Sequence, residues 1–262
     1  MTIQRDYPAD SWTARPGASN RIARIAAQAQ ADVRSTLRNG EQLLLTLVIP
    51  LALLVGLTLF DVAPTATGES TIDVVAPSII ALAVMSTAFT SLAIATGFDR
   101  RSGALKLLGT TPLTRVELVS ARALGVLVIE AIQVVLIIGV SVALGWTPAG
   151  NPLAALLLVV LGTVAFAACG VALAGVLRAE ATLAVANGIY LLLLLGGGVV
   201  IPQSSFPAPM AAIVSLLPSG ALAGGLREAL GAAGGWPWLA AVVLIVWAGA
   251  GFAVAARTFR WD

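Results

Sequence analysis

The sequence predicts an all-α polytopic membrane protein with six transmembrane helices. Hydrophobic residues make up 58% of the 262-residue chain and charged residues only 11%, with a mean hydropathy of +0.96. Soluble domains carry roughly 25% charged residues. Uncharged runs recur that reach the ~20 residues a helix needs to cross a bilayer. Fourteen of the 15 basic residues then fall on one side of the predicted spans, as the excess of Lys and Arg in cytoplasmic loops requires.

The composition also excludes several kinds of site. The chain has no histidine, and its single cysteine is Cys169. Catalytic triads that use histidine and histidine-ligated metal sites are therefore excluded, as is a disulfide within the chain. A net charge of +2 is too small to indicate a nucleic-acid partner.

The N-terminal region is predicted to stay on the cytoplasmic side. Residues 1–19 are expected to form a mobile tail without a cleavable signal peptide. Residues 20–41 are expected to form an amphipathic connecting helix, because apolar residues recur at spacings of three and four. The apolar stripe comprises Ile22, Ile25, Ala29, Val33 and Leu37, with Arg21, Arg24, Arg34 and Arg38 outside it. Such a helix is either a juxtamembrane helix held by anionic lipid or a lever that links the bundle to a cytoplasmic partner.

The transmembrane domain is predicted to cover residues 42–257, followed by a cytoplasmic tail at 258–262. Its six spans are placed at about 43–60, 74–97, 121–146, 152–177, 182–201 and 238–256. Ala181–Leu226 contains no charge over 46 residues and would reach roughly 69 Å as one helix, so it must fold back. Its second half is broken by Pro202, Pro207, Pro209 and Pro218. A short extracellular re-entrant hairpin is therefore expected at about 208–230, with both chain termini cytoplasmic.

The loop between spans two and three, residues 98–122, concentrates charge between two apolar runs. Ser102 is expected to cap a short helix through Leu108, which Gly109 ends. Thr114 and Glu117 form a capping box that begins a second helix leading into span three. The leucines of the short helix, Leu105, Leu107 and Leu108, are expected to be exposed and to need a partner surface. The loop is thus a compact helical elbow.

This elbow resembles the intracellular loop of the ABC-2 family of ATP-binding-cassette transporter permeases, and the resemblance extends over roughly residues 20–257. The matching loop residues are Arg101, Ser102, Gly103, Leu105, Leu108, Thr111, Pro112, Leu113, Thr114, Arg115 and Glu117. The segment before the last span is also similar, in Phe206-Pro207, Leu217-Pro218 and Gly225-Leu226-Arg227.

The resemblance implies that the elbow is a coupling helix seated on a separate ATPase subunit. The residues it assigns to coupling are Arg101, Ser102, Leu105, Lys106, Leu108, Thr111, Pro112, Leu113, Arg115 and Glu117. It also implies two ATPases per complex, a second permease that is a copy or a homologue, an export direction and an extracellular gate. The gate residues would be Phe206, Pro207, Leu217 and Pro218. No phosphate-binding loop surrounds the only lysine, Lys106, so ATP and Mg²⁺ are expected in the partner ATPase, with no cofactor bound by this chain.

Glu130 is the only acidic residue inside a predicted span. A charge at this depth costs roughly 2.5–3.5 kcal/mol and should face the bundle interior or water. Glu130 is either a substrate contact or a structural partner of Arg122, Arg178 or the Asn187 amide. Asn187 and Tyr190 lie on one face of span five and would line a central path or join helices.

The resemblance makes the leading hypothesis a non-catalytic permease subunit of an ATP-driven exporter in a bacterial plasma membrane. Its predominantly apolar spans favour a hydrophobic or amphipathic cargo, such as a drug, an antibiotic or a lipid. The alternative is a transporter or channel that works without ATP. An intramembrane enzyme is disfavoured because the spans contain no second carboxylate and no histidine. Membrane lipid is an expected partner and nucleic acid is not.

Overall fold

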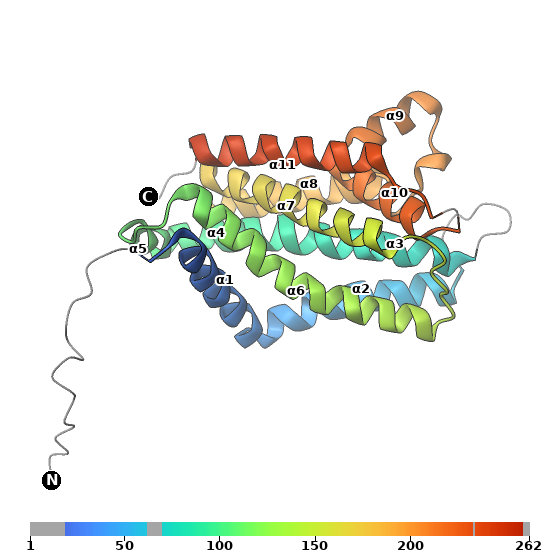
Figure 1. Ribbon diagram of the computed structural model, residues 1–262, viewed down its shortest axis with the longest axis horizontal. Helices are drawn as coiled ribbons and strands as arrows, with labels where there is room; N and C mark the ends of the chain where they lie inside the picture. Colours follow the sequence, from blue (N-terminus) through green and yellow to red (C-terminus); the bar gives the residue numbers. More distant parts are fainter. Residues whose placement is uncertain (1–18, 62–69, 233, 259–262) are drawn as a thin grey trace, which may run out of the picture.

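Long helices packed side by side form the described chain (Figure 1). The computed structural model describes residues 19–61, 70–232 and 234–258. No strand occurs in these ranges, which confirms the all-α prediction. The helices are α1 (Arg21–Arg38), α2 (Gly40–Leu59), α3 (Thr71–Val84), η2 (Met85–Ser91), α4 (Leu92–Arg101), α5 (Ala104–Gly109), α6 (Arg115–Ala143), α7 (Pro152–Val176), α8 (Ala179–Gly196), η3 (Gln203–Ser205), α9 (Ala208–Leu216), α10 (Pro218–Leu230) and α11 (Trp238–Thr258). Residues 1–18 and 259–262 of the expected tails lie outside the described residues.

Five helices of the described chain are long and apolar enough to cross a membrane. They are Thr71–Arg101, Arg115–Ala143, Pro152–Val176, Ala179–Gly196 and Trp238–Arg257. A bent pair, α9 with α10, raises the number to six if it is counted as one span. The apolar part of α2, Thr46–Leu59, is shorter. The five long helices overlap five of the six expected spans, whereas the expected first span, 43–60, contains only the shorter apolar helix and the bent pair lies where a hairpin was expected. The chain is a multi-pass membrane protein.

The span Thr71–Arg101 is continuous but changes its winding in the middle. Residues Met85–Ser91 form a π-helical segment, η2, between α3 and α4. The wider turn holds Thr87, whose hydroxyl donates to Gln133 Oε1 of α6 at 3.1 Å. Gln133 Nε2 in turn donates to the Thr46 carbonyl of α2 at 3.0 Å. Local π-helical turns are frequent at functional sites, and this one joins three helices through polar side chains.

The core lies around α7, which packs along α11 and also contacts η2, α4, α6 and α10. Phe166 of α7 is 1% exposed and faces Phe89 of η2 with ring centroids 6.3 Å apart. Leu158 of α7 and Leu222 of α10 belong to the same buried cluster. Close packing of this kind stabilises helices inside a membrane, where apolar burial alone does not favour association.

The segment after α8 departs from the predicted fifth span. The helix ends at Gly196 instead of continuing to Ile201, because Gly198 has a φ of +78°, a left-handed conformation that ends a helix. The chain then passes through η3 into α9 and α10, whose axes differ by 99° at the break between them. Pro207 is the N-cap of α9, and Pro218 is the first residue of α10.

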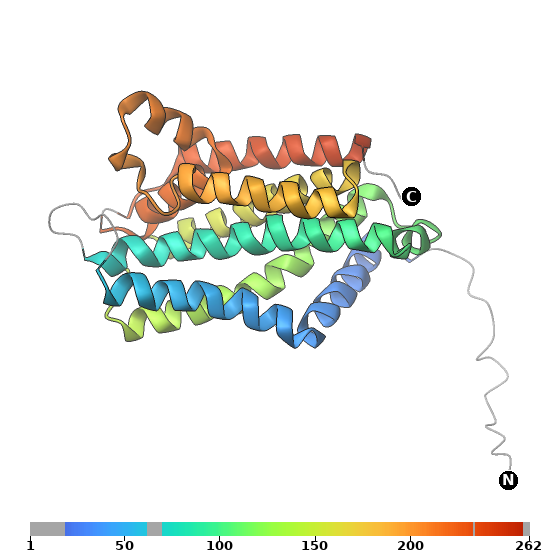
Figure 2. The same ribbon diagram turned by 180° about the vertical axis from the view of Figure 1, so that it is seen from behind.

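The two ends of the bundle differ in character (Figures 1 and 2). We call the end that carries α5 the elbow end. The start of α1 and the last turn of α11 lie there too, and α9 and α10 lie at the opposite end. Helix α1 packs obliquely on α6. Its apolar stripe is split, because Ala29 is buried against α6 whereas Ile22 and Leu37 are 78% and 46% exposed.

Candidate functional site

The elbow is a double turn between α4 and α6 that contains the short helix α5. Gly103 has a φ of +80° and reverses the chain between α4 and α5, a conformation that glycine adopts without a steric penalty. It occupies the position before α5 where Ser102 was expected, so the predicted Ser102 cap is wrong. The Ser102 hydroxyl instead donates to the Asp99 carbonyl at 3.0 Å. The capping box of Thr114 and Glu117 is confirmed.

The elbow presents one face to its surroundings and anchors the other in the core. The expectation that Leu105 is exposed is wrong, because it is 0% exposed and belongs to the buried cluster. Leu113 is 9% exposed, Leu108 is half-buried and Leu107 is 72% exposed. The exposed polar residues of the predicted coupling set are Arg101, Ser102, Lys106, Thr111 and Arg115, together with exposed Pro112. A partner would therefore meet hydroxyl and basic groups around a single leucine.

Glu117 is turned away from that exposed face and holds α1. Its side chain is 2% exposed. Arg24 donates to both of its carboxylate oxygens, with Nε 3.3 Å from Oε2, and Arg21 Nε lies 3.5 Å from Oε1. The Thr114 amide adds a further donor at 2.8 Å. This residue of the predicted coupling set therefore joins the elbow to α1.

Three other arginines tie the elbow to the rest of the bundle. Arg100 donates through Nη1 to the Gly175 carbonyl at 3.0 Å and through Nη2 to the Leu177 carbonyl, at the turn between α7 and α8. Arg101 pairs with Glu180 at the start of α8. Arg115 donates to the Ala256 carbonyl of α11 at 3.3 Å. These arginines thus join the elbow to the turn between α7 and α8, to the start of α8 and to the end of α11.

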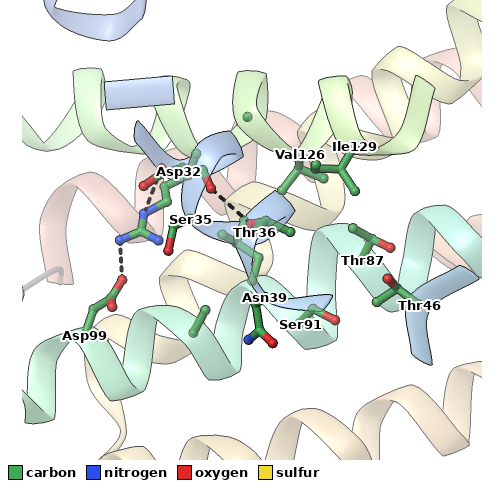
Figure 3. Close-up of a pocket in the computed structure, with 14 residues that line it drawn as sticks. Asp32, Ser35, Thr36, Asn39, Thr46, Thr87, Ser91, Asp99, Val126 and Ile129 are labelled. Carbon is green, nitrogen blue, oxygen red and sulfur yellow. Dashed lines mark hydrogen bonds and ion pairs between the residues drawn. The ribbon is translucent and has the colours of Figure 1, made fainter. Parts of the chain in front are cut away.

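A polar cavity of about 210 Å³ lies beneath α1 at the elbow end (Figure 3). Its lining comprises Asp32, Ser35, Thr36, Asn39, Thr46, Thr87, Ser91, Leu92, Ala95, Asp99, Arg122, Gly125, Val126 and Ile129. Arg122 Nη2 donates to Asp99 Oδ2 at 2.5 Å, and Arg122 Nε lies 3.5 Å from Asp32 Oδ2. Burial raises the pKa of Asp32 above its ordinary value, although Arg122 opposes this. The sequence reasoning assigned Arg122 only as one possible partner of Glu130.

The three residues proposed for a substrate path are not brought together. Glu130 is 1% exposed and accepts a hydrogen bond from the Thr163 hydroxyl of α7. None of its expected partners contacts it in the described chain. Asn187 is exposed on α8, and its amide donates to the Leu183 carbonyl of its own helix at 2.9 Å. Tyr190 is half-buried on α8.

At the opposite end, Arg227 holds the break between α8 and α10. It donates through Nε and Nη2 to the Ser78 hydroxyl of α3 at 3.2 and 2.8 Å. It also donates to the carbonyls of Gly198 and Val199 at 2.9 and 2.6 Å. The signal in the sequence was its position as the only basic residue expected on that side, but its contacts could not be assigned.

The predicted gate residues lie beside this break. Pro218 is buried, Phe206 and Leu217 are half-buried and Pro207 is exposed. Two of them, Leu217 and Pro218, also line an apolar cavity of about 550 Å³. Its lining comprises Phe89, Phe166, Cys169, Ala172, Leu173, Val176, Leu177, Ile189, Leu193, Leu217, Pro218, Trp247, Ala250, Gly251 and Val254. It therefore runs along α7, α8 and α11 and is suited to an apolar molecule.

The described residues contain no group of three or more acidic, cysteine or histidine side chains that could hold a metal ion.

Comparison with models of known protein families gives a match over most of the chain. Residues 25–257 match the model of the family described as "ABC-2 family transporter protein". None of the curated proteins compared with the chain gives a match. The matched region begins within α1 and ends in α11, and includes the elbow, the polar cavity and the α9–α10 break.

Proposed function

Since this chain belongs to the ABC-2 family of transporter proteins, we propose that it is the transmembrane permease of an ATP-driven exporter. Membership makes it a membrane subunit of an ABC transporter and implies association with an ABC ATPase. The proposal adds that a hydrophobic or amphipathic compound is moved outward and that ATP and Mg²⁺ are bound and used only in the ATPase.

The exposed face of the elbow carries this proposal. Lys106, Leu107 and Thr111 project from a base that Leu105 anchors in the core. An exposed leucine surrounded by cations and hydroxyls matches the general pattern of an apolar anchor within a polar rim at protein interfaces. The short helix is thus suited to dock into a cleft of the ATPase.

The contacts behind that face would transmit movement. Arg24 and Glu117 join the elbow to α1, Arg101 joins it to α8, and Arg115 joins it to α11. When the two ATPases close around ATP, a displacement of α5 is expected to move these helices together. Rigid-body movement of packed helices is an established way in which a local event reaches a distant site.

The apolar cavity beside α8 supports the choice of cargo. Leu217 and Pro218 lie at its limit, where α9 and α10 meet at 99°. In the proposal, this break is an extracellular re-entrant gate formed with Phe206 and Pro207, and the elbow faces the cytoplasm of a bacterial cell. A second permease, either a copy or a homologue, and two ATPases complete the transporter. Glu130, Asn187 and Tyr190 remain candidate residues of the path.

The test is copurification of an ATPase from native membranes with the full chain as bait. The altered chain carries Lys106→Glu together with Leu107→Asp on the exposed elbow. A matched control carries Arg34→Glu, which reverses an exposed charge on α1 at the same end. We expect the original chain and the control to retain the ATPase and the elbow variant to lose at least nine-tenths of it.

Two results would contradict the proposal. Retention of the ATPase by the elbow variant would move the docking surface elsewhere. Transport by the purified chain in vesicles without any ATPase would instead favour the transporter or channel that works without ATP.

A further inference from the structure

The apolar cavity along α7, α8 and α11 is open towards the surroundings of the bundle. None of its lining residues carries a charge, a hydroxyl or an amide side chain. Its floor is buried, at Phe89 and Phe166, whereas Val176 and Val254 at its edge are 61% and 47% exposed. Lipid surrounds the outward-facing sides of membrane spans, so a molecule can enter this cavity sideways from the bilayer.

The cavity covers the depth of one leaflet. Trp247, in its lining, lies ten residues before Arg257 on α11. This separation is roughly 15 Å along a helix, half of the ~30 Å hydrocarbon core. At the inner end, the Trp247 indole donates to the Leu216 carbonyl at 3.0 Å, and Leu217 and Pro218 line the cavity there. The cavity is therefore about as deep as one layer of acyl chains.

Two exposed arginines lie at the outer end of the cavity, which is the elbow end. Arg178 directly follows Leu177 of the lining. Arg257 follows Val254 of the lining by three residues, which places both on one face of α11. Neither guanidinium has a hydrogen bond or an ion pair with any part of the chain that the structure describes. The other arginines of the elbow end that we described above are bonded to carbonyls or carboxylates.

The positive charge at this end is available to a ligand. Glu180 lies two residues after Arg178, but it is already paired with Arg101. Arginines at the ends of membrane spans reach the headgroup level. A guanidinium binds phosphate oxygens through two parallel hydrogen bonds. The outer end of the cavity is thus complementary in charge to an anionic headgroup that contains phosphate.

We propose that this cavity holds one acyl chain of an anionic phospholipid from the leaflet at the elbow end, and that Arg178 and Arg257 contact the phosphate of its headgroup. The apolar lining supplies contact with the chain, and the two arginines select the headgroup. A zwitterionic lipid has the same chains without the net negative charge, so it binds less well. This inference goes beyond the exporter proposal because it concerns the permease alone. A cargo that used the same cavity would displace the lipid.

The experiment is photo-cross-linking of the full chain in nanodiscs of phosphatidylcholine. The nanodiscs contain a small amount of a probe lipid with a photoreactive acyl chain, which carries either a phosphatidylglycerol or a phosphatidylcholine headgroup. Mass spectrometry then measures how much of the chain carries the probe and at which residues. We expect the phosphatidylglycerol probe to label the cavity lining at least about fivefold more than the phosphatidylcholine probe, since each arginine near the headgroups contributes a factor of this size.

A charge variant tests the two arginines. Arg178→Gln together with Arg257→Gln should lower labelling by the phosphatidylglycerol probe to the level of the phosphatidylcholine probe. The matched control is Arg34→Gln together with Arg38→Gln, which removes two exposed arginines of α1 and should keep the fivefold preference.

A second variant tests the cavity itself. Ala250→Trp fills the cavity from an exposed position of its lining and should reduce labelling of the lining by both probes. Ala253→Trp makes the same change at an exposed position of α11 outside the lining and should leave labelling unchanged. All of these substitutions replace exposed side chains, so we expect the variants to fold, and their melting temperatures check this.

Three results would overturn the proposal. Equal labelling of the lining by the two probes would show that the cavity accepts any lipid. A preference for phosphatidylglycerol that persists without Arg178 and Arg257 would place the headgroup elsewhere. Labelling confined to residues outside the lining would show that no acyl chain enters the cavity. The measurement contains no ATPase, so this proposal can fail while the exporter proposal stands, and failure of the copurification test would leave it unaffected.

Discussion

Glu130 shows how a carboxyl side chain is accommodated within a membrane span. One of its carboxylate oxygens accepts from Thr163, and the other has no hydrogen-bond partner and is buried. Thr163 is 0% exposed, and its hydroxyl oxygen also lies 2.7 Å from the Val159 carbonyl, so its single proton serves one of these two acceptors at a time. A buried side chain with an unused acceptor either contacts a ligand in another conformation of the protein or is retained for packing. Substitutions distinguish these two roles.

Glu130→Gln tests the difference. The amide keeps an acceptor for Thr163 and carries no charge, so we expect thermal stability equal to that of the original chain or higher. Glu130→Ala should lower the free energy of unfolding by about 3 kcal/mol, because it leaves a cavity. Thermal melts of both variants measure this effect. If Glu130→Gln folds normally and transports normally, Glu130 has a packing role, and lost transport with normal folding would place it on the substrate path.

Asp32 gives a second prediction for single residues, based on pH. Its carboxylate faces Arg122, Asp99 and the Gln28 amide. The raised pKa of Asp32 means that the folded chain holds the carboxyl proton more tightly than the unfolded chain does. Its contribution to stability is therefore present below about 3.8, the ordinary value, and is lost as pH rises through the folded value.

Asp32→Asn should consequently be as stable as the original chain or more stable at neutral pH. As pH falls towards 4, the stability of the original chain should rise relative to that of Asp32→Asn. Parallel melts in vesicles across this range measure it. A difference that stays constant with pH would show that Asp32 does not titrate in this way.

At the scale of elements, the elbow depends on both local and distant information. The start of α6 was predictable because Thr114 and Glu117 lie three residues apart and satisfy each other's backbone donors. The burial of Leu105 was not predictable, because it depends on helices far away in the chain. The early end of α8 was partly visible in its three consecutive glycines, but only the conformation of Gly198 shows where the helix stops.

Replacing Gly103 by valine tests whether the elbow needs its left-handed turn. No atom lies within 4 Å of the added Cβ, so the penalty is conformational and amounts to about 1–2 kcal/mol. We expect a lower melting temperature and weaker capture of the ATPase. Gly139→Ala on α6 also meets open space but has helical geometry, and it should be neutral or slightly stabilising. Equal effects of the two substitutions would contradict this account.

At the scale of the whole molecule, features that depend on local sequence could be predicted, and features that depend on distant residue pairs could not. Apolar runs and basic loops depend on neighbouring residues and the membrane, so the all-helical architecture was clear. The candidate site depends on pairs such as Arg24 with Glu117 and Glu130 with Thr163, which lie 93 and 33 residues apart. Nothing in the spacing of the chain indicates such pairs. The family match assigns a transporter without deciding what these contacts do.

The connection of α1 to the bundle is a property of the whole chain. Glu117→Lys places a cation among Arg21 and Arg24, so α1 should separate from α6. Spin labels at Ala26 and Val128 should report a longer and broader distance distribution than in the original chain. The elbow surface stays exposed, so copurification of the ATPase should persist while transport falls at least tenfold. An unchanged distance would show that other contacts alone hold α1.

The burial of Leu105 has a consequence for the assembly of the proposed transporter. A coupling helix whose leucines all needed a partner would leave the newly inserted chain exposed to quality-control proteases until an ATPase arrived. Here the chain itself covers Leu105, and Leu113 is nearly covered as well. In the proposed transporter, the permease would therefore complete its folding in the bilayer before it meets the ATPase, and synthesis of the two subunits would not need to be synchronised.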